Sequence, residues 1–150
     1  MNYTELKVNI QDICEQSFTD EQLAMFTQQA EQFIYNTVQI PALRKNQTGN
    51  LGVGNPYLIY PVDFLYTFSL AVIDAQGDYL YLLNKDVNFM REAYPNPTST
   101  GKPKHYGVFD DTAFVLGPTP DAAYEMELHY GYYPQTIVTA GTTWLGDEFD

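Results

Sequence analysis

Basic residues are scarce in this sequence, and its last part has none. The 150 residues include 7 lysines and arginines against 19 aspartates and glutamates, which gives a formal net charge of −12. From His105 to Asp150 there is no lysine or arginine, but there are eight acidic residues: Asp110, Asp111, Asp121, Glu125, Glu127, Asp147, Glu148 and Asp150. Attraction to nucleic acid or to an anionic membrane needs basic residues. The composition therefore argues against both as attractive partners.

Cysteine pairs and long apolar runs are also missing. The one cysteine, Cys14, cannot form an internal disulfide, and its place in a helical pattern predicts a buried apolar residue. No apolar stretch approaches the roughly 18 residues that span a membrane. The N-terminus shows no basic region followed by an apolar run. The sequence thus predicts a soluble protein made in a cytoplasm.

Catalytic motifs are absent as well. There is no nucleophile elbow and no dinucleotide fingerprint, and the glycine-rich segment 43–57 lacks the ending of a phosphate loop, so it is predicted to be a flexible or clasping loop. Asp110 and Asp111 fall where a hairpin turn needs aspartate. His129 alternates with two glutamates in a predicted strand, which indicates a solvated face more than a metal site. We expect no enzymatic activity, no cofactor and no metal.

Aromatic residues, by contrast, are abundant. Hydrophobic residues make up 45% of the chain and aromatics 15%, with 13 tyrosines. This composition is that of a globular protein. It holds more tyrosine than a small core absorbs, so some tyrosines are expected at interfaces, where a large ring with one polar tip is favoured.

The N-terminal part, residues 1–45, predicts a helical hairpin. Apolar residues recur at helical spacing from Thr4, a candidate N-cap, to Glu15. Thr19 and Gln22 then form a capping box that opens a second helix, which Pro41 ends. The face of this helix predicted to be buried consists of Leu23, Phe26, Ala30, Phe33, Ile34 and Thr37.

Residues 46–150 predict an antiparallel β domain with one short helix near 86–94, capped by Asp86. Within 79–83, the side chains of Tyr79, Tyr81 and Leu83 are expected on one face of a strand. Residues 106–133 are expected to form a three-stranded meander whose strands are 106–109, 113–116 and 123–133. In the third strand the predicted buried face is Tyr124, Met126, Leu128, Tyr130 and Tyr132, and the reverse face is acidic. The fold class is α+β.

Four stretches resemble the head-to-tail adaptor, or connector, proteins of tailed and mainly short-tailed bacteriophages. They are "FTQQAEQFIYNTVQIPALR", "YPVDFLYTFSLAVID", "YLLNKDVNFMREAYPNPTSTGKPKHYGVFDDTAFVLGPTPDAAYEMELHYGYYP" and "TTWLGDEFD". In this order they span nearly the whole chain. The resemblance implies a virion structural protein in the neck, where about twelve copies form a ring under the portal protein. Genomic DNA would pass through the ring without specific binding, and a tail or nozzle protein would attach below it. Family members continue into further long helices after the last stretch, so this chain is expected to be a partial or shortened member.

The same resemblance suggests which residues dock. Basic residues are expected at the portal or tail contact, namely Arg44, Lys45, Lys102 and Lys104. Aromatic residues are expected at the subunit interface, namely Tyr124, Tyr130, Tyr132, Tyr133 and Trp144. Because −12 charges per copy repel one another, the ring is expected to form mainly on its portal. An alternative remains open at this point, a carbohydrate- or receptor-binding module of a tail protein, because sugar sites also combine exposed aromatics with carboxylates.

Overall fold

The computed structural model describes residues 2–142, which divide into two compact units. Within the described residues, the helical unit consists of 2–43 and 133–142. The β unit is Arg44–Tyr132. The sequence suggested a boundary near residue 45 and placed everything after it in the β domain. In the structure the boundary lies close to that residue, but the segment that follows the last strand belongs to the helical unit and not to the β unit.

The helical unit begins with the expected hairpin, made of α1 (Tyr3–Cys14) and α2 (Asp20–Thr37). Thr19 caps α2 as predicted, and Gln22 completes the capping box. The cap of α1 is Asn2 and not Thr4, because Asn2 pairs reciprocally with Glu5. The short helices η1 (Pro41–Leu43) and α4 (Ile137–Ala140) complete the unit. Across the described residues, no helix combines the length and the apolarity needed to cross a membrane.

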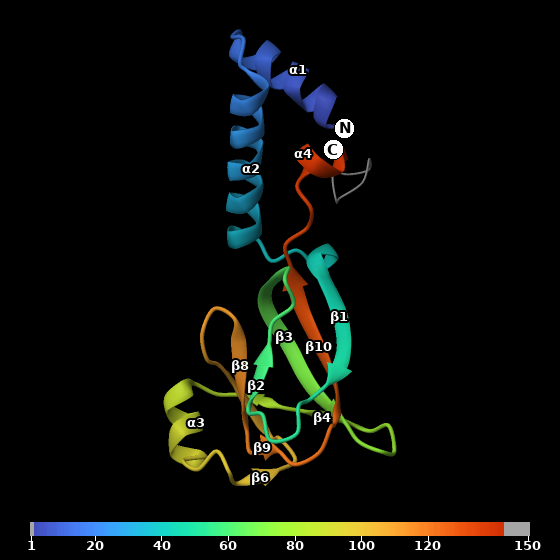
Figure 1. Cartoon of the computed structure of the whole chain (residues 1–150). Coiled ribbons are helices and arrows are strands. Elements are labelled where there is room, and N and C mark those ends of the chain that lie inside the picture. The colour runs from blue at the N-terminus through green and yellow to red at the C-terminus, as the bar shows by residue number, and fades with distance from the viewer. Residues whose placement is uncertain (1, 143–150) are drawn as a thin grey trace. The chain divides into compact units, whose positions relative to one another are not determined.

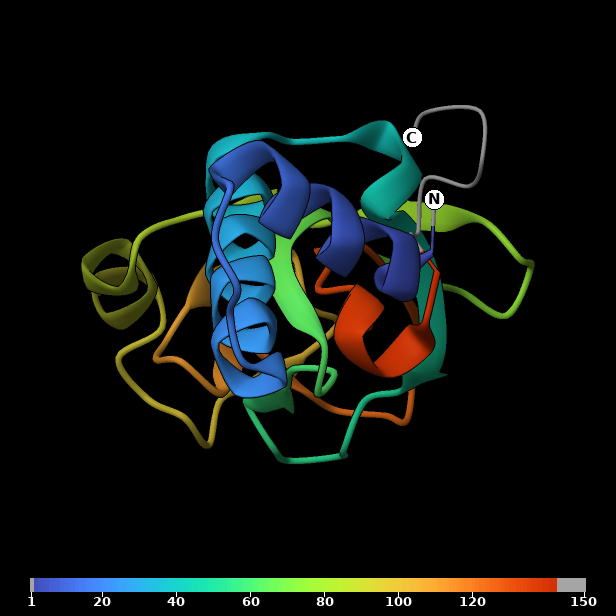
Figure 2. The same ribbon diagram turned by 90° about the horizontal axis from the view of Figure 1, so that it is seen from above.

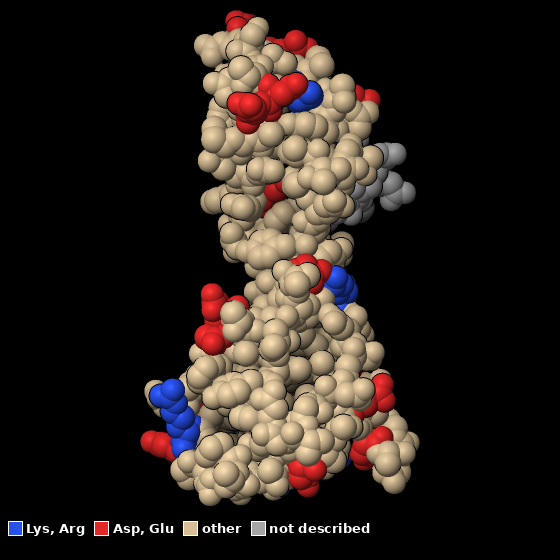
Figure 3. Space-filling view, in the orientation of Figure 1, with Lys and Arg blue, Asp and Glu red and all other residues tan. Residues whose placement is uncertain are grey.

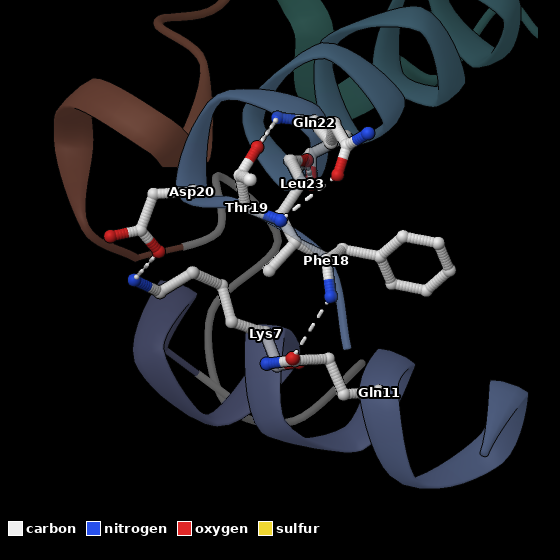
Figure 4. A network of polar contacts seen from close by, with 8 residues as sticks. Lys7, Gln11, Phe18, Thr19, Asp20, Gln22 and Leu23 are labelled. Atoms are coloured by element: carbon white, nitrogen blue, oxygen red, sulfur yellow. Dashed lines mark hydrogen bonds and ion pairs between the residues drawn. The ribbon is translucent and has the colours of Figure 1, made fainter. Parts of the chain in front are cut away.

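Polar contacts fix the turn between α1 and α2 (Figure 4). Lys7 of α1 forms an ion pair with Asp20, the first residue of α2, with Nζ and Oδ1 2.8 Å apart. The Phe18 amide donates to the Gln11 side chain across 3.2 Å. Both contacts fasten the end of the connection that leads into α2 back to side chains of α1.

The buried face of α2 shares Leu23 with the predicted one but otherwise differs from it. Both ribbon views show α1 and α4 on the same side of α2 (Figures 1 and 2). The buried residues of α2 are Leu23, Thr27 and Tyr35. Phe33, which was predicted to be buried, is 72% exposed. The helical period alone cannot choose between overlapping stripes, and α4, which comes from the far end of the chain, makes the choice. Cys14 is exposed, contrary to prediction, because α1 buries none of its residues.

The β unit holds two four-stranded sheets and a two-stranded one. The first sheet is antiparallel, in the order β1 (Arg44–Asn50), β10 (Glu125–Tyr132), β3 (Phe64–Ile73) and β4 (Tyr79–Tyr81). The second has the order β2 (Tyr57–Ile59), β8 (Ala113–Gly117), β7 (His105–Val108) and β5 (Leu83–Asn84). The pair β6 (Thr100–Gly101) and β9 (Thr119–Pro120) forms the third. The predicted short helix is α3 (Val87–Ala93), whose cap is Asp86.

Two predictions about this unit are wrong. Residues 44–50 were expected in a loop, but they form β1, which pairs with β10 along its whole length. Their polar, glycine-containing sequence conceals the strand, since an edge strand needs no apolar face of its own. The predicted meander is also interrupted. The hairpin of β7 and β8 forms, but the third strand crosses to the first sheet and lies between β1 and β3.

The core lies between the two large sheets. Its buried members include Leu70 and Val72 from β3, Phe114 from β8, and Leu128 and Tyr130 from β10. The alternation predicted for β10 is confirmed, since Met126, Leu128 and Tyr130 are buried. The reverse face of β10 is acidic only at its first half. At Gly131 it is covered by the ring of Tyr66, which would lie 2.4 Å from an added Cβ.

Candidate assembly surfaces

Tyr130 lies inside the β unit, although the sequence suggested it for a subunit interface. Its side chain is fully buried, and its ring stacks on that of Phe64 with the centroids 6.0 Å apart. Its hydroxyl donates to Asp63 Oδ1 across 3.0 Å. The residue therefore packs the core and cannot present its ring to a neighbouring subunit.

Lys45 joins the same network. Its ammonium pairs with the Asp63 carboxylate and lies over the ring of Tyr132, 4.7 Å from the centroid. Partial burial alone would raise the pKa of Asp63, but the hydrogen bonds from Lys45 and Tyr130 outweigh this effect and hold that pKa below its usual value. Lys45 and Tyr132 are thus committed to contacts within the chain, and they tie β1 and β10 to the start of β3.

The remaining predicted aromatic residues have separate surroundings. Tyr124 packs against the core cluster and donates its hydroxyl to Asp121 Oδ1 across 2.7 Å. Tyr133 belongs to the helical unit, where its hydroxyl donates to Asn36 across 2.8 Å and its ring meets Tyr35 edge-on. Tyr133 keeps 38% of its surface exposed. Trp144 lies outside the described residues.

The four basic residues suggested for docking do not form one patch. Arg44 and Lys45 lie near the start of β3, where Arg44 stacks on Phe68 with the guanidinium carbon 4.0 Å from the centroid. Lys102 lies beyond the other end of β3, 3.7 Å from Asp74. Lys104 is exposed. The view in Figure 3 likewise shows basic side chains scattered singly among acidic ones.

The helical unit carries the exposed apolar surface that the sequence did not predict. Phe26, Phe33 and Ile34 share one stripe of α2, since they are related by seven and eight residues. They are 39%, 72% and 42% exposed. On α1, Val8 and Ile13 are 52% and 83% exposed. We call the stripe of Phe26, Phe33 and Ile34 the helical apolar surface. The periodicity of α2 indicates a stripe of apolar residues, but it does not show whether the chain itself or a partner covers that stripe.

The candidate chemical groups have structural roles. Asp110 Oδ1 accepts from the amides of Thr112 and Ala113 and from the Thr112 hydroxyl, which confirms the predicted turn. The hydroxyl of Thr112, followed by the amide hydrogen bonds, lowers the pKa of Asp110. His105 Nδ1 lies 2.6 Å from the Tyr94 hydroxyl, a contact that fastens α3 to β7. Among residues 2–142, no cluster of histidine, cysteine and carboxylate side chains could hold a metal ion.

Comparison with known proteins also indicates a structural role. A search of curated proteins finds no match to the chain. The family described as SU10 adaptor protein matches residues 1–150, the whole length of the sequence. The chain therefore belongs to the SU10 adaptor protein family, which consists of structural adaptor proteins of phages and not of enzymes.

Proposed function

We propose that this protein is a subunit of a head-to-tail adaptor ring in the neck of a phage particle. About twelve copies surround the DNA channel under the portal protein, as a cyclic heterologous assembly. The ring provides the platform to which a tail or nozzle protein attaches. Family membership over residues 1–150 supports the adaptor role, and the surface of the helical unit supports the association of copies.

The observation that carries the proposal is the helical apolar surface. A monomeric protein normally buries a stripe such as Phe26, Phe33 and Ile34, because burying each large apolar side chain stabilises by about 1.5–3 kcal/mol. In this chain the stripe is exposed, whereas Leu23, three residues before Phe26 on an overlapping face of α2, is 1% exposed. A neighbouring copy that covers the stripe with its own helices would recover this stabilisation.

Charge supports the passage of DNA through the ring. The chain has a formal net charge of −12, and its few basic residues are dispersed. Three of the seven, Lys7, Lys45 and Lys102, are already paired with carboxylates. A channel wall of this composition repels the phosphate backbone, so DNA slides without being held. The same charge opposes assembly of free subunits at low salt, and it favours assembly on a portal that supplies opposite charge.

The decisive experiment measures copy number and its dependence on the helical apolar surface. Mass spectrometry of purified phage particles should give about a dozen copies per particle relative to the portal, as expected for a closed ring. Ring assembly on purified portal, followed by native mass spectrometry, should be lost in Phe33→Glu. The matched control is Gln29→Glu, which adds the same charge to an exposed polar position of α2. Absence from particles, or full assembly by Phe33→Glu, would contradict the proposal.

The docking role of the basic residues is a separate part of the proposal. Lys104 is exposed, and Lys102 is only loosely paired with Asp74, so both ammonium groups can be recruited by a carboxylate of the portal. Replacing both residues by glutamate should weaken docking to the portal while leaving the folded chain intact. The control is Lys85→Glu, which changes the charge elsewhere in the β unit. If the double variant docks to the portal as well as the natural chain does, these two lysines take no part in the contact.

A further inference from the structure

Strand β4 is an edge strand whose side chains are all exposed. In the first sheet it pairs with β3 on one side, and no other described strand pairs with it (Figure 1). Tyr79, Leu80 and Tyr81 are 48%, 40% and 60% exposed. An exposed apolar edge is a template for pairing with another chain, and proteins usually protect it with a very short strand, lysine, proline or a bulge. Strand β4 is short, but Tyr79–Tyr81 contains neither lysine nor proline.

The backbone groups at the open side of β4 can be assigned from its hydrogen bonds. Leu82 donates to the carbonyl of Leu70 across 2.8 Å, and Asp74 donates to that of Asp78 across 3.1 Å. Because the direction of N–H and C=O groups alternates along a strand, Leu80 also faces β3. The N–H and C=O groups of Tyr79 and Tyr81 therefore point to the open side, where an extended segment can pair with them.

Tyrosine and glutamate side chains lie together on one face of the sheet beside this edge. The register of the sheet places Tyr79, Ile73 and Glu125 in one row across β4, β3 and β10. The next row on the same face consists of Tyr81, Ala71 and Glu127. The rings of Tyr79 and Tyr81 lie nearly parallel, at an interplanar angle of 27°, with centroids 6.3 Å apart. We call these four polar and aromatic residues, Tyr79, Tyr81, Glu125 and Glu127, the acidic aromatic face.

The acidic aromatic face carries negative charge without any positive charge. Glu127, and to a lesser extent Glu125, raises the pKa of the Tyr79 hydroxyl, so the carboxylates act directly on the aromatic rows. Neither row contains a lysine or an arginine. Aromatic ring faces and carboxylates both attract ammonium and guanidinium groups, and they do so most strongly where a partner excludes water.

We propose that β4 and the acidic aromatic face form a docking site for an extended basic segment of another protein. The segment adds a strand along Tyr79–Tyr81. Its lysine or arginine side chains lie on the two tyrosine rings and reach Glu125 and Glu127, while an apolar side chain on the other face covers Leu80. Such strand addition takes its affinity from main-chain hydrogen bonds and its specificity from alternate side chains.

The occupant is a different protein and not a second copy of this chain. Lys45, on the opposite edge strand of the sheet, pairs with Asp63, and Arg44 beside it stacks on Phe68. Lys7 and Arg91 lie on helices, and the backbone groups of Lys104 are already bonded to Gly117 and Leu83. The described part of a neighbouring copy therefore offers no open strand with several free lysine or arginine side chains. The site goes beyond the proposed ring, because it depends only on the β unit.

The test uses short random peptides displayed on mRNA and selected against the full chain. We expect the selected peptides to carry lysine or arginine at alternate positions. Their affinity should fall by about tenfold for Tyr79→Thr/Tyr81→Thr and by a similar factor for Glu125→Gln/Glu127→Gln. The matched controls are Tyr57→Thr, which removes an exposed ring on β2, and Glu15→Gln/Glu21→Gln, which removes two acids of the helical unit. Neither control should change the affinity.

Backbone pairing is tested with the selected peptide itself. N-methylation of alternate residues should abolish binding in one register and leave it unchanged in the other, since only every second amide of an added strand faces β4. Three results would overturn the proposal. They are selected peptides without an excess of basic residues, equal loss of affinity in the control variants, and binding of neutral glycans or of a second copy at Tyr79 and Tyr81 instead. The proposed ring is tested separately, by the assembly of the Phe33→Glu variant on the portal.

Discussion

Tyr130 of β10 donates its hydroxyl hydrogen to Asp63, the residue before β3, across 3.0 Å, and the same carboxylate pairs with Lys45 of β1. One acidic side chain thus holds three strands of the first sheet at the end where β3 begins. The arrangement keeps the ring of Tyr130 inside the β unit, and it gives Lys45, whose side chain is 43% exposed, an acidic partner within the chain.

Replacing Asp63 with asparagine should destabilise the β unit by about 1–2 kcal/mol, because a hydrogen bond to a charged group is weakened and an ion pair is lost. Urea unfolding followed by circular dichroism measures the change. The control is Asp20→Asn, which removes the exposed pair with Lys7 and should cost about 0.5 kcal/mol or less. Equal losses of unfolding free energy in the two variants would show that the hydrogen bond from Tyr130 to Asp63 adds no stability beyond that of an exposed ion pair.

The contribution of Asp63 should depend on pH in a defined direction. Its pKa is lower in the folded chain than the ordinary value of 3.8. The stabilisation is therefore fully present above about pH 4 and is lost as the pH falls through the folded pKa. The difference in unfolding free energy between the natural chain and Asp63→Asn should shrink between pH 6 and pH 3. A difference that stays constant over this range would contradict the assignment.

Substituting alanine for Gly131 should destabilise the first sheet. An added Cβ would lie 2.4 Å from the Tyr66 ring, which must move, so a cost of about 1–3 kcal/mol is expected. Gly49→Ala is the control on the neighbouring strand, where the Cβ meets only the flexible end of Met126 at 3.2 Å. The midpoint of thermal unfolding should fall clearly in the first variant and little in the second. Similar midpoints would mean that the ring adjusts freely.

Glu31→Gln should loosen α4 from α2. The Glu31 carboxylate accepts from the Thr136 hydroxyl across 2.5 Å and from the Ile137 amide across 2.9 Å. A neutral amide accepts these bonds more weakly, and the loss should be about 1–2 kcal/mol for local opening. Hydrogen exchange of residues 137–140 is the measurement, with Glu21→Gln as the control on the same helix. Unchanged exchange would show that α4 is held by apolar contacts alone.

Local sequence signals predicted most of the elements. The capping box at Thr19, the cap at Asp86 and the aspartate turn at Asp110 were recognised, because each depends on residues a few positions apart. The burial of Met126, Leu128 and Tyr130 followed from the period of two along a strand. The docking roles suggested for the basic residues stay predictions, and the structure shows which of those residues are already paired.

The α+β class, the helical hairpin and the buried face of β10 follow from local patterns of residues, and the family follows from the match over the whole chain. Which stripe of α2 is covered, that residues 44–50 are a strand, and that β10 lies between β1 and β3 become evident only in the folded chain. One cause accounts for all of these differences. Periodicity and capping are set by neighbours in the sequence, whereas strand pairing and the choice of a buried face are set by segments far away along the chain, such as α4 against α2.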